Sequence, residues 1–147
     1  MLLLGIKNVS SQTLITDQLV NLGSVYRRYC RKNDCGIPTF SYDGTSVSLQ
    51  HRGMYKITIT AIVSGTVAGD VTLQLLENGT PITGALATET ITTPTTELRT
   101  MSIDYYVLVD SDCVLGNLST TIEALSLQNT GVGATITNIV TNVLKVS

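Results

Sequence analysis

The amino-acid sequence predicts an all-β protein, an antiparallel β-sandwich or barrel with a short N-terminal arm. Several segments alternate apolar and polar residues with a period of two, which is typical of half-buried strands. Turn residues interrupt these segments at short intervals, as they do in sandwiches and barrels. The length of 147 residues suits one domain with a core of its own, and helical periodicity is almost absent.

The N-terminal segment, residues 1–35, is expected to form the arm that docks onto a partner, and residues 36–147 the sandwich domain. The best helix candidate lies within the arm, at Ser11–Leu22, where three leucines could share one face. Thr and Ile are also frequent in that stretch. A strand or an extended conformation is therefore an equally good interpretation.

Three segments of the sandwich show the strand alternation clearly. Their expected core positions are Tyr55, Ile57, Ile59, Ala61 and Val63, then Val71, Leu73 and Leu75, and finally Met101, Ile103, Tyr105, Val107 and Val109. Glycine-containing turns separate such segments, among them Asn78-Gly79, which lies between an apolar run and a Thr-rich run. Asn-Gly in that position predicts a tight hairpin.

The last segments carry apolar residues on both faces of the expected strands. The outer face of a monomeric sandwich is normally polar, so we expect these strands to be covered twice, by the core and by a neighbouring subunit. The residues expected to face that subunit are Leu125, Leu127, Ile139 and Val143.

The composition also favours an assembly. Only 14% of the residues are charged and mean hydropathy is +0.27, against about 25% charged in an average soluble domain. Because charge keeps surfaces apart, part of this surface is expected to meet other protein. The apolar runs are far shorter than the ~20 residues that cross a bilayer. The opening MLLLG lacks the basic residues of a signal peptide, so we expect neither a membrane partner nor export.

Charge is distributed unevenly along the chain. Residues 1–32 hold five basic residues against one acidic, a net of +4, and the remainder holds four against ten, a net of −6. A basic patch interleaved with aromatics can bind nucleic acid. On an otherwise acidic chain, protein docking or simple solvation is the better interpretation, so nucleic acid is not an expected partner. The candidate docking residues are Tyr26, Arg27, Arg28, Tyr29, Arg31 and Lys32.

Residues suited to catalysis or metal binding are sparse. His51 is the only histidine, at an apparent strand–turn boundary, and is expected to be a surface turn residue. A zinc site at Cys30 and Cys35 would need two more good ligands, and Asp110 with Asp112 fits a solvated turn better than a cation site. The chain also lacks phosphate-loop and dinucleotide-binding motifs. We therefore expect no enzyme activity, no cofactor and no metal.

One pair of motifs points to a known family. Gly53-Met-Tyr55 opens a core strand, and the hairpin Leu75-Leu-Glu-Asn-Gly79-Thr-Pro-Ile82 follows it. This Gly-x-Tyr strand with its L-x-x-N-G-x-x-I hairpin resembles the trimeric jelly rolls of the complement and tumour-necrosis-factor superfamily. It is most similar to the versions on bacterial exosporium filaments and bacteriophage virions. The family's frequent Gly-Asp-x-Val turn is absent, because the sequence 110–114 holds no glycine.

The resemblance implies a jelly roll that forms a homotrimer, with the doubly apolar last strands near the three-fold axis. Because the chain has no collagen-like stalk, it implies a non-enzymatic bacteriophage virion protein, assembled in the host cytoplasm. As a head fibre or capsid decoration protein, it would bind the major capsid protein through its arm. The alternative is a receptor- or glycan-binding module of a tail fibre, baseplate or spore surface. Exposed tyrosines in loops distal to the arm would favour that alternative.

Overall fold

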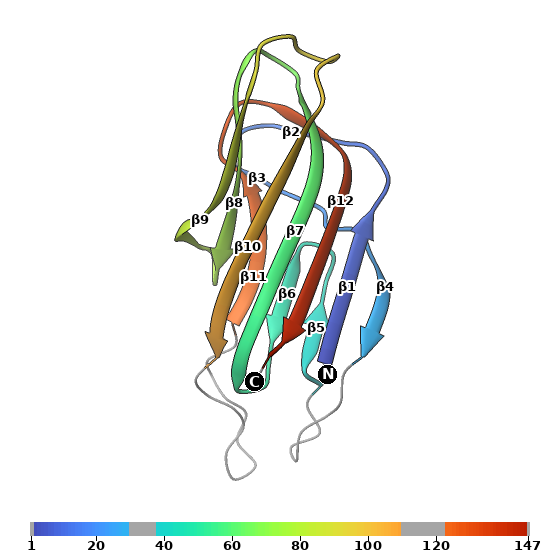
Figure 1. The fold of residues 1–147 in the computed structure, drawn as a ribbon, viewed down its shortest axis with the longest axis vertical. Coiled ribbons are helices and arrows are strands. Elements are labelled where there is room, and N and C mark those ends of the chain that lie inside the picture. Colours follow the sequence, from blue (N-terminus) through green and yellow to red (C-terminus); the bar gives the residue numbers. More distant parts are fainter. Residues whose placement is uncertain (1, 30–37, 110–122, 147) are drawn as a thin grey trace.

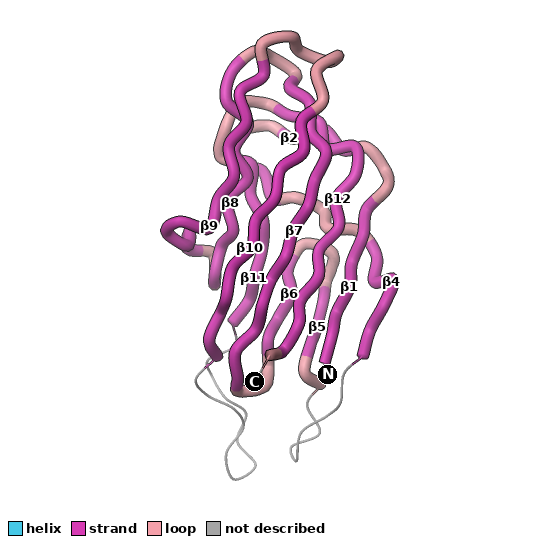
Figure 2. The backbone as a smooth tube through the Cα atoms, in the orientation of Figure 1, coloured by secondary structure: helices cyan, strands magenta, loops and turns pink. Residues whose placement is uncertain are grey.

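The computed structural model describes residues 2–29, 38–109 and 123–146. These residues form two six-stranded antiparallel sheets that face each other (Figure 1). Figure 2 shows strands and connecting loops throughout the described chain. The described residues contain no helix, and so none that is long and apolar enough to cross a membrane.

Sheet A has the strand order β10-β7-β12-β1-β4, and β2 pairs with β12. Sheet B has the order β5-β6-β11-β8-β9, and β3 pairs with β11. The chain crosses repeatedly between the sheets, which gives a jelly-roll sandwich. The bounds in sheet A are β1 Leu2–Asn8, β2 Gln12–Leu14, β4 Ser24–Tyr29, β7 Gly53–Gly65, β10 Arg99–Val109 and β12 Ala134–Lys145. Those in sheet B are β3 Gln18–Leu19, β5 Phe40–Tyr42, β6 Ser46–Leu49, β8 Gly69–Glu77, β9 Thr80–Ile91 and β11 Glu123–Asn129.

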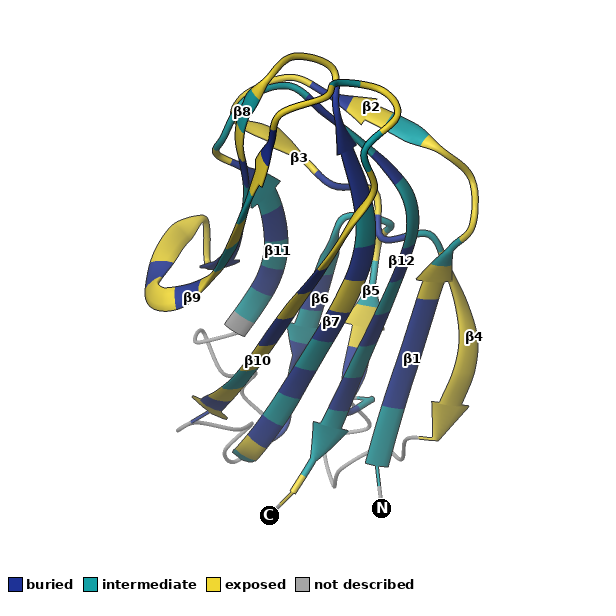
Figure 3. Ribbon diagram, turned by 45° about the horizontal axis from the view of Figure 1, so that its top comes forward, coloured by how far each residue is buried: buried dark blue, intermediate teal, exposed yellow. Residues whose placement is uncertain are grey.

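The predicted alternation is confirmed in β7, β8 and β10. Their predicted core residues are buried, except Tyr105, which is half-buried (Figure 3). The predicted hairpin is also present, because β8 and β9 pair from Glu77 opposite Thr80. Asn78 and Gly79 both have positive φ, as a two-residue hairpin turn with the twist of its strands requires.

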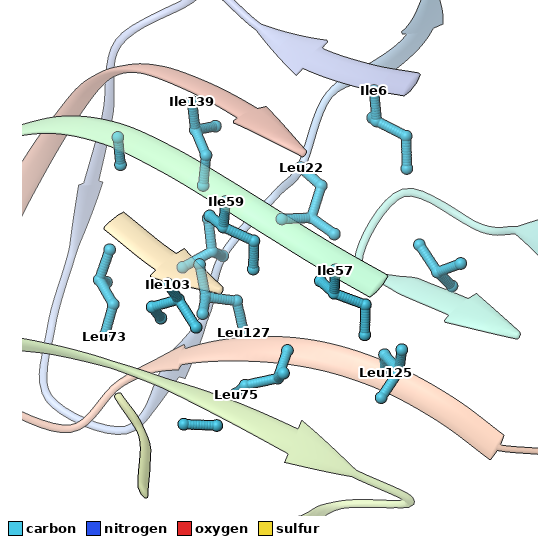
Figure 4. Packing of buried hydrophobic residues seen from close by; sticks show 14 of the residues in the cluster. Ile6, Leu22, Ile57, Ile59, Leu73, Leu75, Ile103, Leu125, Leu127 and Ile139 are labelled. Atoms are coloured by element: carbon cyan, nitrogen blue, oxygen red, sulfur yellow. The ribbon is translucent and has the colours of Figure 1, made fainter. Parts of the chain in front are cut away.

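The core lies between the two sheets. Ile57 and Ile59 of sheet A face Leu75 and Leu127 of sheet B (Figure 4). Each fully buried aliphatic side chain of this kind contributes roughly 1.5–3 kcal/mol relative to an exposed one. The two sheets are therefore held together mainly by apolar side chains.

Residues 2–29 are part of the sandwich and do not form an arm. β1 lies inside sheet A between β12 and β4, with Leu4 opposite Val143 and Ile6 opposite Thr141. Leu4 and Ile6 are fully buried. The helix considered at Ser11–Leu22 is also not formed, because this stretch holds β2 and β3. The expected division at residue 35 is therefore wrong: the segment before it contributes strands to both sheets.

The residues expected to face a neighbouring subunit lie in the core of one chain. Their exposed fractions are 3% for Leu125, 0% for Leu127, 0% for Ile139 and 1% for Val143. In β12 the register shifts between Ile136 and Asn138, so that Ile136 and Ile139 both point inward although an odd number of steps separates them. The prediction is therefore wrong for these four residues, since none of them reaches the surface.

His51 differs from its expected role as a surface residue, since only 6% of it is exposed. Its Nδ1 lies 3.0 Å from the hydroxyl oxygen of Thr39, at hydrogen-bond distance. The buried Tyr55 hydroxyl donates to the His51 carbonyl oxygen at 2.6 Å. These bonds tie the beginning of β7 to the segment before β5, which indicates a structural role for this histidine.

Thr141 is a polar residue inside the core. It is 2% exposed, and its hydroxyl has no hydrogen-bond partner among the described residues. It borders a small cavity between the sheets, lined mainly by aliphatic side chains such as Ile57, Leu75 and Leu125. A buried hydroxyl without a partner reduces stability.

We predict that Thr141→Val stabilises the protein. The substitution removes the unpartnered hydroxyl at little change of volume, so the free energy of unfolding should rise by about 1 kcal/mol in urea denaturation. Thr60→Val, at an exposed position of β7, is the matched control and should change it by less than about 0.5 kcal/mol. A lower stability of Thr141→Val would mean that the hydroxyl has a partner in solution.

Glu97 fixes the loop between β9 and β10. Its Oε1 accepts hydrogen bonds from the backbone N–H of Thr92 at 2.9 Å and of Thr93 at 3.0 Å. Its Oε2 accepts from the Arg99 guanidinium, with 2.9 Å to Nε. The backbone bonds from Thr93 and Thr92, followed by Arg99, lower the pKa of Glu97 from 4.5 to about 2.

This lowered pKa predicts a specific pH dependence of stability. A carboxyl whose pKa falls on folding adds stability that is complete above its unfolded pKa and is lost as pH falls through its folded pKa. The wild-type chain should therefore have a higher Tm than Glu97→Gln at neutral pH. The difference should shrink between pH 4.5 and about pH 2. A difference that stays constant over that range would contradict the role given to this carboxylate.

Candidate interaction surfaces

Four of the six candidate docking residues lie together on β4. Tyr26, Arg27, Arg28 and Tyr29 are all exposed, on a strand at the edge of sheet A. Arg27 and Arg28 form no ion pair within the described part of the chain. Arg31 and Lys32 lie outside the described residues, as do Cys30, Cys35, Asp110 and Asp112. The structure thus supports a basic, aromatic strand at this edge.

The side chain of Tyr26 is exposed but is held in place by contacts with sheet A. Gly5 pairs with Arg27 and Ile6 with Val25, so Tyr26 is the extra residue of a bulge in β4. Its ring lies over Gly5, where a Cβ atom would come within 2.9 Å of the ring.

Two further contacts hold this ring against sheet A. The Tyr26 hydroxyl donates to Asn142 Oδ1 of β12 at 2.9 Å. The Lys7 ammonium lies 5.3 Å from the ring centroid, within the range of a cation–π contact. Tyr26 therefore fastens β4 to β1 and β12.

The outer face of sheet A, which points away from sheet B, carries a group of apolar side chains from several strands. In one row across the strands, Tyr106 lies opposite Lys56, Lys56 opposite Leu144, and Leu144 opposite Leu3. In the next row Leu108 lies opposite Met54. Tyr106 is 55% exposed and Leu108 56% exposed. We call Leu3, Met54, Tyr106, Leu108 and Leu144 the apolar patch.

Charged groups beside the apolar patch are largely paired. Lys56 Nζ lies 3.6 Å from Asp104 Oδ2 and 6.0 Å from the centroid of the Tyr106 ring. The aliphatic stem of a lysine can also cover apolar surface while its charged end stays in water. This part of sheet A therefore presents mostly apolar side chains and one internally neutralised pair.

The outer face of sheet B is different in character. Its outward positions are mostly hydroxyl and amide residues, and the Thr72 and Thr88 hydroxyls are hydrogen-bonded at 3.0 Å. Leu86, 47% exposed, is a large apolar exception. The outward polar residues are Ser46, Ser48, Thr72, Thr88, Thr90, Ser126 and Gln128. The two outer faces thus differ, one partly apolar and the other mainly polar.

A signal for the apolar patch was present in the sequence. Residues 105–109 read Tyr-Tyr-Val-Leu-Val, a run without the polar alternation that precedes it. The structure places Tyr105, Val107 and Val109 toward the core and leaves the two residues between them on the outer face. Apolar residues on both faces were expected in the last strands, and β12 does place Leu144, half-buried, on the outer face. β10 is a second example, with outward residues that are more exposed.

In the part of the chain that the structure describes, neither a metal centre nor an aromatic loop cluster is seen. The described ranges contain no group of three or more His, Cys, Asp or Glu side chains that could hold a metal ion. All six tyrosines lie in strands, at positions 26, 29, 42, 55, 105 and 106. The exposed loop tyrosines that would favour a glycan-binding module are therefore not found.

Comparison with known proteins shows similarity of fold. No family model and no curated protein matches the sequence. The tumour-necrosis-factor protein Eiger of S. frugiperda is 8% identical, with a TM-score of 0.65 over 99% of this chain and 91% of that one. The globular domain of zebrafish complement 1qA is 10% identical, with a TM-score of 0.63 over 99% and 97%. The PRD1 vertex protein P5 is 17% identical, with a TM-score of 0.54 over 99% and 97%.

These similarities extend over nearly the whole chain, so they concern the complete sandwich and include β1 to β4. At such low identity they establish the architecture. The chain has the jelly-roll fold found in complement and tumour-necrosis-factor-like proteins, as its Gly-x-Tyr strand and Asn-Gly hairpin predicted.

Proposed function

We propose that this chain is a non-enzymatic structural protein of a bacteriophage virion, a homotrimer that decorates the capsid. The observation that carries the proposal is the contrast between its two outer faces, on a fold shared with tumour-necrosis-factor, complement and phage vertex proteins. One face is suited to contact with copies of the chain, and the other to contact with water.

Self-association is supported by the apolar patch. Tyr106 and Leu108 lie on β10, at the edge of sheet A, and Leu3 lies three strands away in the same sheet. Exposed apolar side chains that cluster mark interaction surfaces, whereas single ones need no explanation. The low proportion of charged residues agrees with a surface that other copies cover. When the patch of one copy contacts a different part of the surface of the next copy, such contacts can close into a ring. The family resemblance favours a ring of three copies.

A virion location is supported by the similarity to the PRD1 vertex protein and by the basic strand β4. In the proposed arrangement, the apolar patch joins the copies while β4 remains available for the major capsid protein. Attachment then depends on a strand of the sandwich itself, because residues 2–29 are part of both sheets.

The self-association proposal predicts that Leu108→Asp converts the assembly to monomers. Leu108 is exposed within one chain, so the fold should persist, whereas each copy would lose roughly 1.5–3 kcal/mol of apolar burial and gain a buried charge. Sedimentation should distinguish one chain of 15.7 kDa from a trimer. Leu86→Asp on the outer face of sheet B is the matched control and should remain trimeric. A wild-type chain that sediments as a monomer would contradict the proposal.

The virion proposal predicts that the protein is a regular part of phage particles. Particles purified by density gradient from cells that carry the gene should contain the chain in constant stoichiometry, measured by quantitative mass spectrometry. Electron microscopy with an antibody against the chain should label the capsid. Label confined to tails would replace decoration by a tail location. Absence of the chain from particles would overturn the virion proposal.

A further inference from the structure

The free edge of β4 is an open position in sheet A. β4 is hydrogen-bonded to β1 along one side, and its other side has no backbone partner in the described ranges. All six of its residues, Ser24–Tyr29, are exposed, and Figure 3 shows β4 exposed along its length beside β1, whose middle is buried. Such an edge is a template for one more strand.

The opposite side of the sandwich is arranged differently. There the edge strands β9 and β10 contact each other, and the loop held by Glu97 joins them. On the β4 side, the edge strand of sheet B is β5, which has three residues. β5, with three residues, is therefore too short to cover the free edge of the six-residue β4 along its full length.

The side chains of β4 indicate what kind of strand would fit. Arg27 lies opposite Gly5 and Arg28 opposite Leu4, whose side chain faces the core, so the two guanidinium groups leave the edge on opposite faces. Neither has an ion-pair partner in the described chain. An arginine guanidinium can bind a carboxylate through two parallel hydrogen bonds. Tyr29, which follows Arg28 on β4, is also exposed. An added strand would meet a positive charge on each of its faces.

The same charges disfavour a second copy of this chain at this edge. Pairing β4 with β4 of another copy would bring like charges together across neighbouring strands, which is destabilising. Arginine and tyrosine are also among the residues enriched in protein interfaces. An extended segment rich in carboxylates can pair both with the backbone N–H and C=O groups along the free edge of β4 and with the two guanidinium groups.

We propose that β4 binds an extended acidic segment of another protein by strand addition, with carboxylates paired to Arg27 and Arg28. This deepens the proposed function, on which it rests for the origin of that segment in another virion protein. Binding would continue sheet A by one strand and leave the apolar patch to the contacts between copies.

The test uses the full chain and a capped peptide of alternating Glu and Val residues, followed by fluorescence anisotropy. We expect saturable binding, about tenfold weaker for the double variant Arg27→Glu, Arg28→Glu. Arg52→Glu, an exposed arginine in the turn before β7, is the matched control and should bind as the wild type does. No binding to the wild-type chain would overturn the proposal.

Two further measurements separate strand addition from simple charge attraction. The same peptide N-methylated at every residue keeps its carboxylates but cannot donate backbone hydrogen bonds, so it should not bind. Hydrogen exchange should also slow at alternate amides of Ser24–Tyr29 when the unmethylated peptide is added. Equal binding of the methylated peptide, or unchanged exchange, would overturn strand addition.

The remaining controls identify the class of partner. A single-stranded oligonucleotide should bind far less than the peptide, and tighter binding of the oligonucleotide would replace the proposal by a nucleic-acid surface. The double variant should still form trimers in sedimentation, because β4 lies outside the apolar patch. If the chain proves monomeric or absent from particles, the proposed function fails, while peptide binding alone decides the role of β4.

Discussion

The pairing of β1 with β12 is the interaction on which most of this structure depends. It joins Leu2–Asn8 to the last described strand, so residues far apart in the sequence lie side by side within sheet A. Among the described strands β4 pairs with β1 alone, and Leu4 and Ile6 are placed in the core by the position of β1 in sheet A. Folding must therefore close the longest loop available to the chain, whose entropic cost makes such pairings slow to form.

The parts of the fold that the sequence predicted are those specified by neighbouring residues. The alternation of β7, β8 and β10 can be seen within each strand, and Asn78-Gly79 sets its turn by local backbone chemistry. β1 has no such pattern, because three leucines in succession obscure the alternation and Gly5 has no side chain. Gly5 leaves space for the ring of Tyr26, which lies on another strand, β4. Because Gly5 and Tyr26 meet only after folding, the sequence around Gly5 does not reveal this contact.

The errors in the interaction surfaces also have a structural cause. Ile139 and Val143 seemed to belong to a second face because a bulge in β12, formed against β7, reverses the alternation. Nothing in a single strand reveals such a register shift. Arg27 and Arg28 were predicted as docking residues from the charge pattern alone, and that role stays a prediction. Their position at an edge of sheet A can be seen only once the strand order is known. They therefore belong to the side of a sheet and not to a separate attachment arm.

The antiparallel pairing of β1 with β12 also places Leu2 directly opposite Lys145, and Figure 1 shows both termini at the same end of the sandwich. A short peptide linker could join these ends without crossing the core, and the chain could be reopened at the exposed Asn78-Gly79 turn. The circularly permuted protein would keep every strand neighbour. Its order of synthesis would change: β1 and β12 would leave the ribosome one after the other, as an ordinary hairpin.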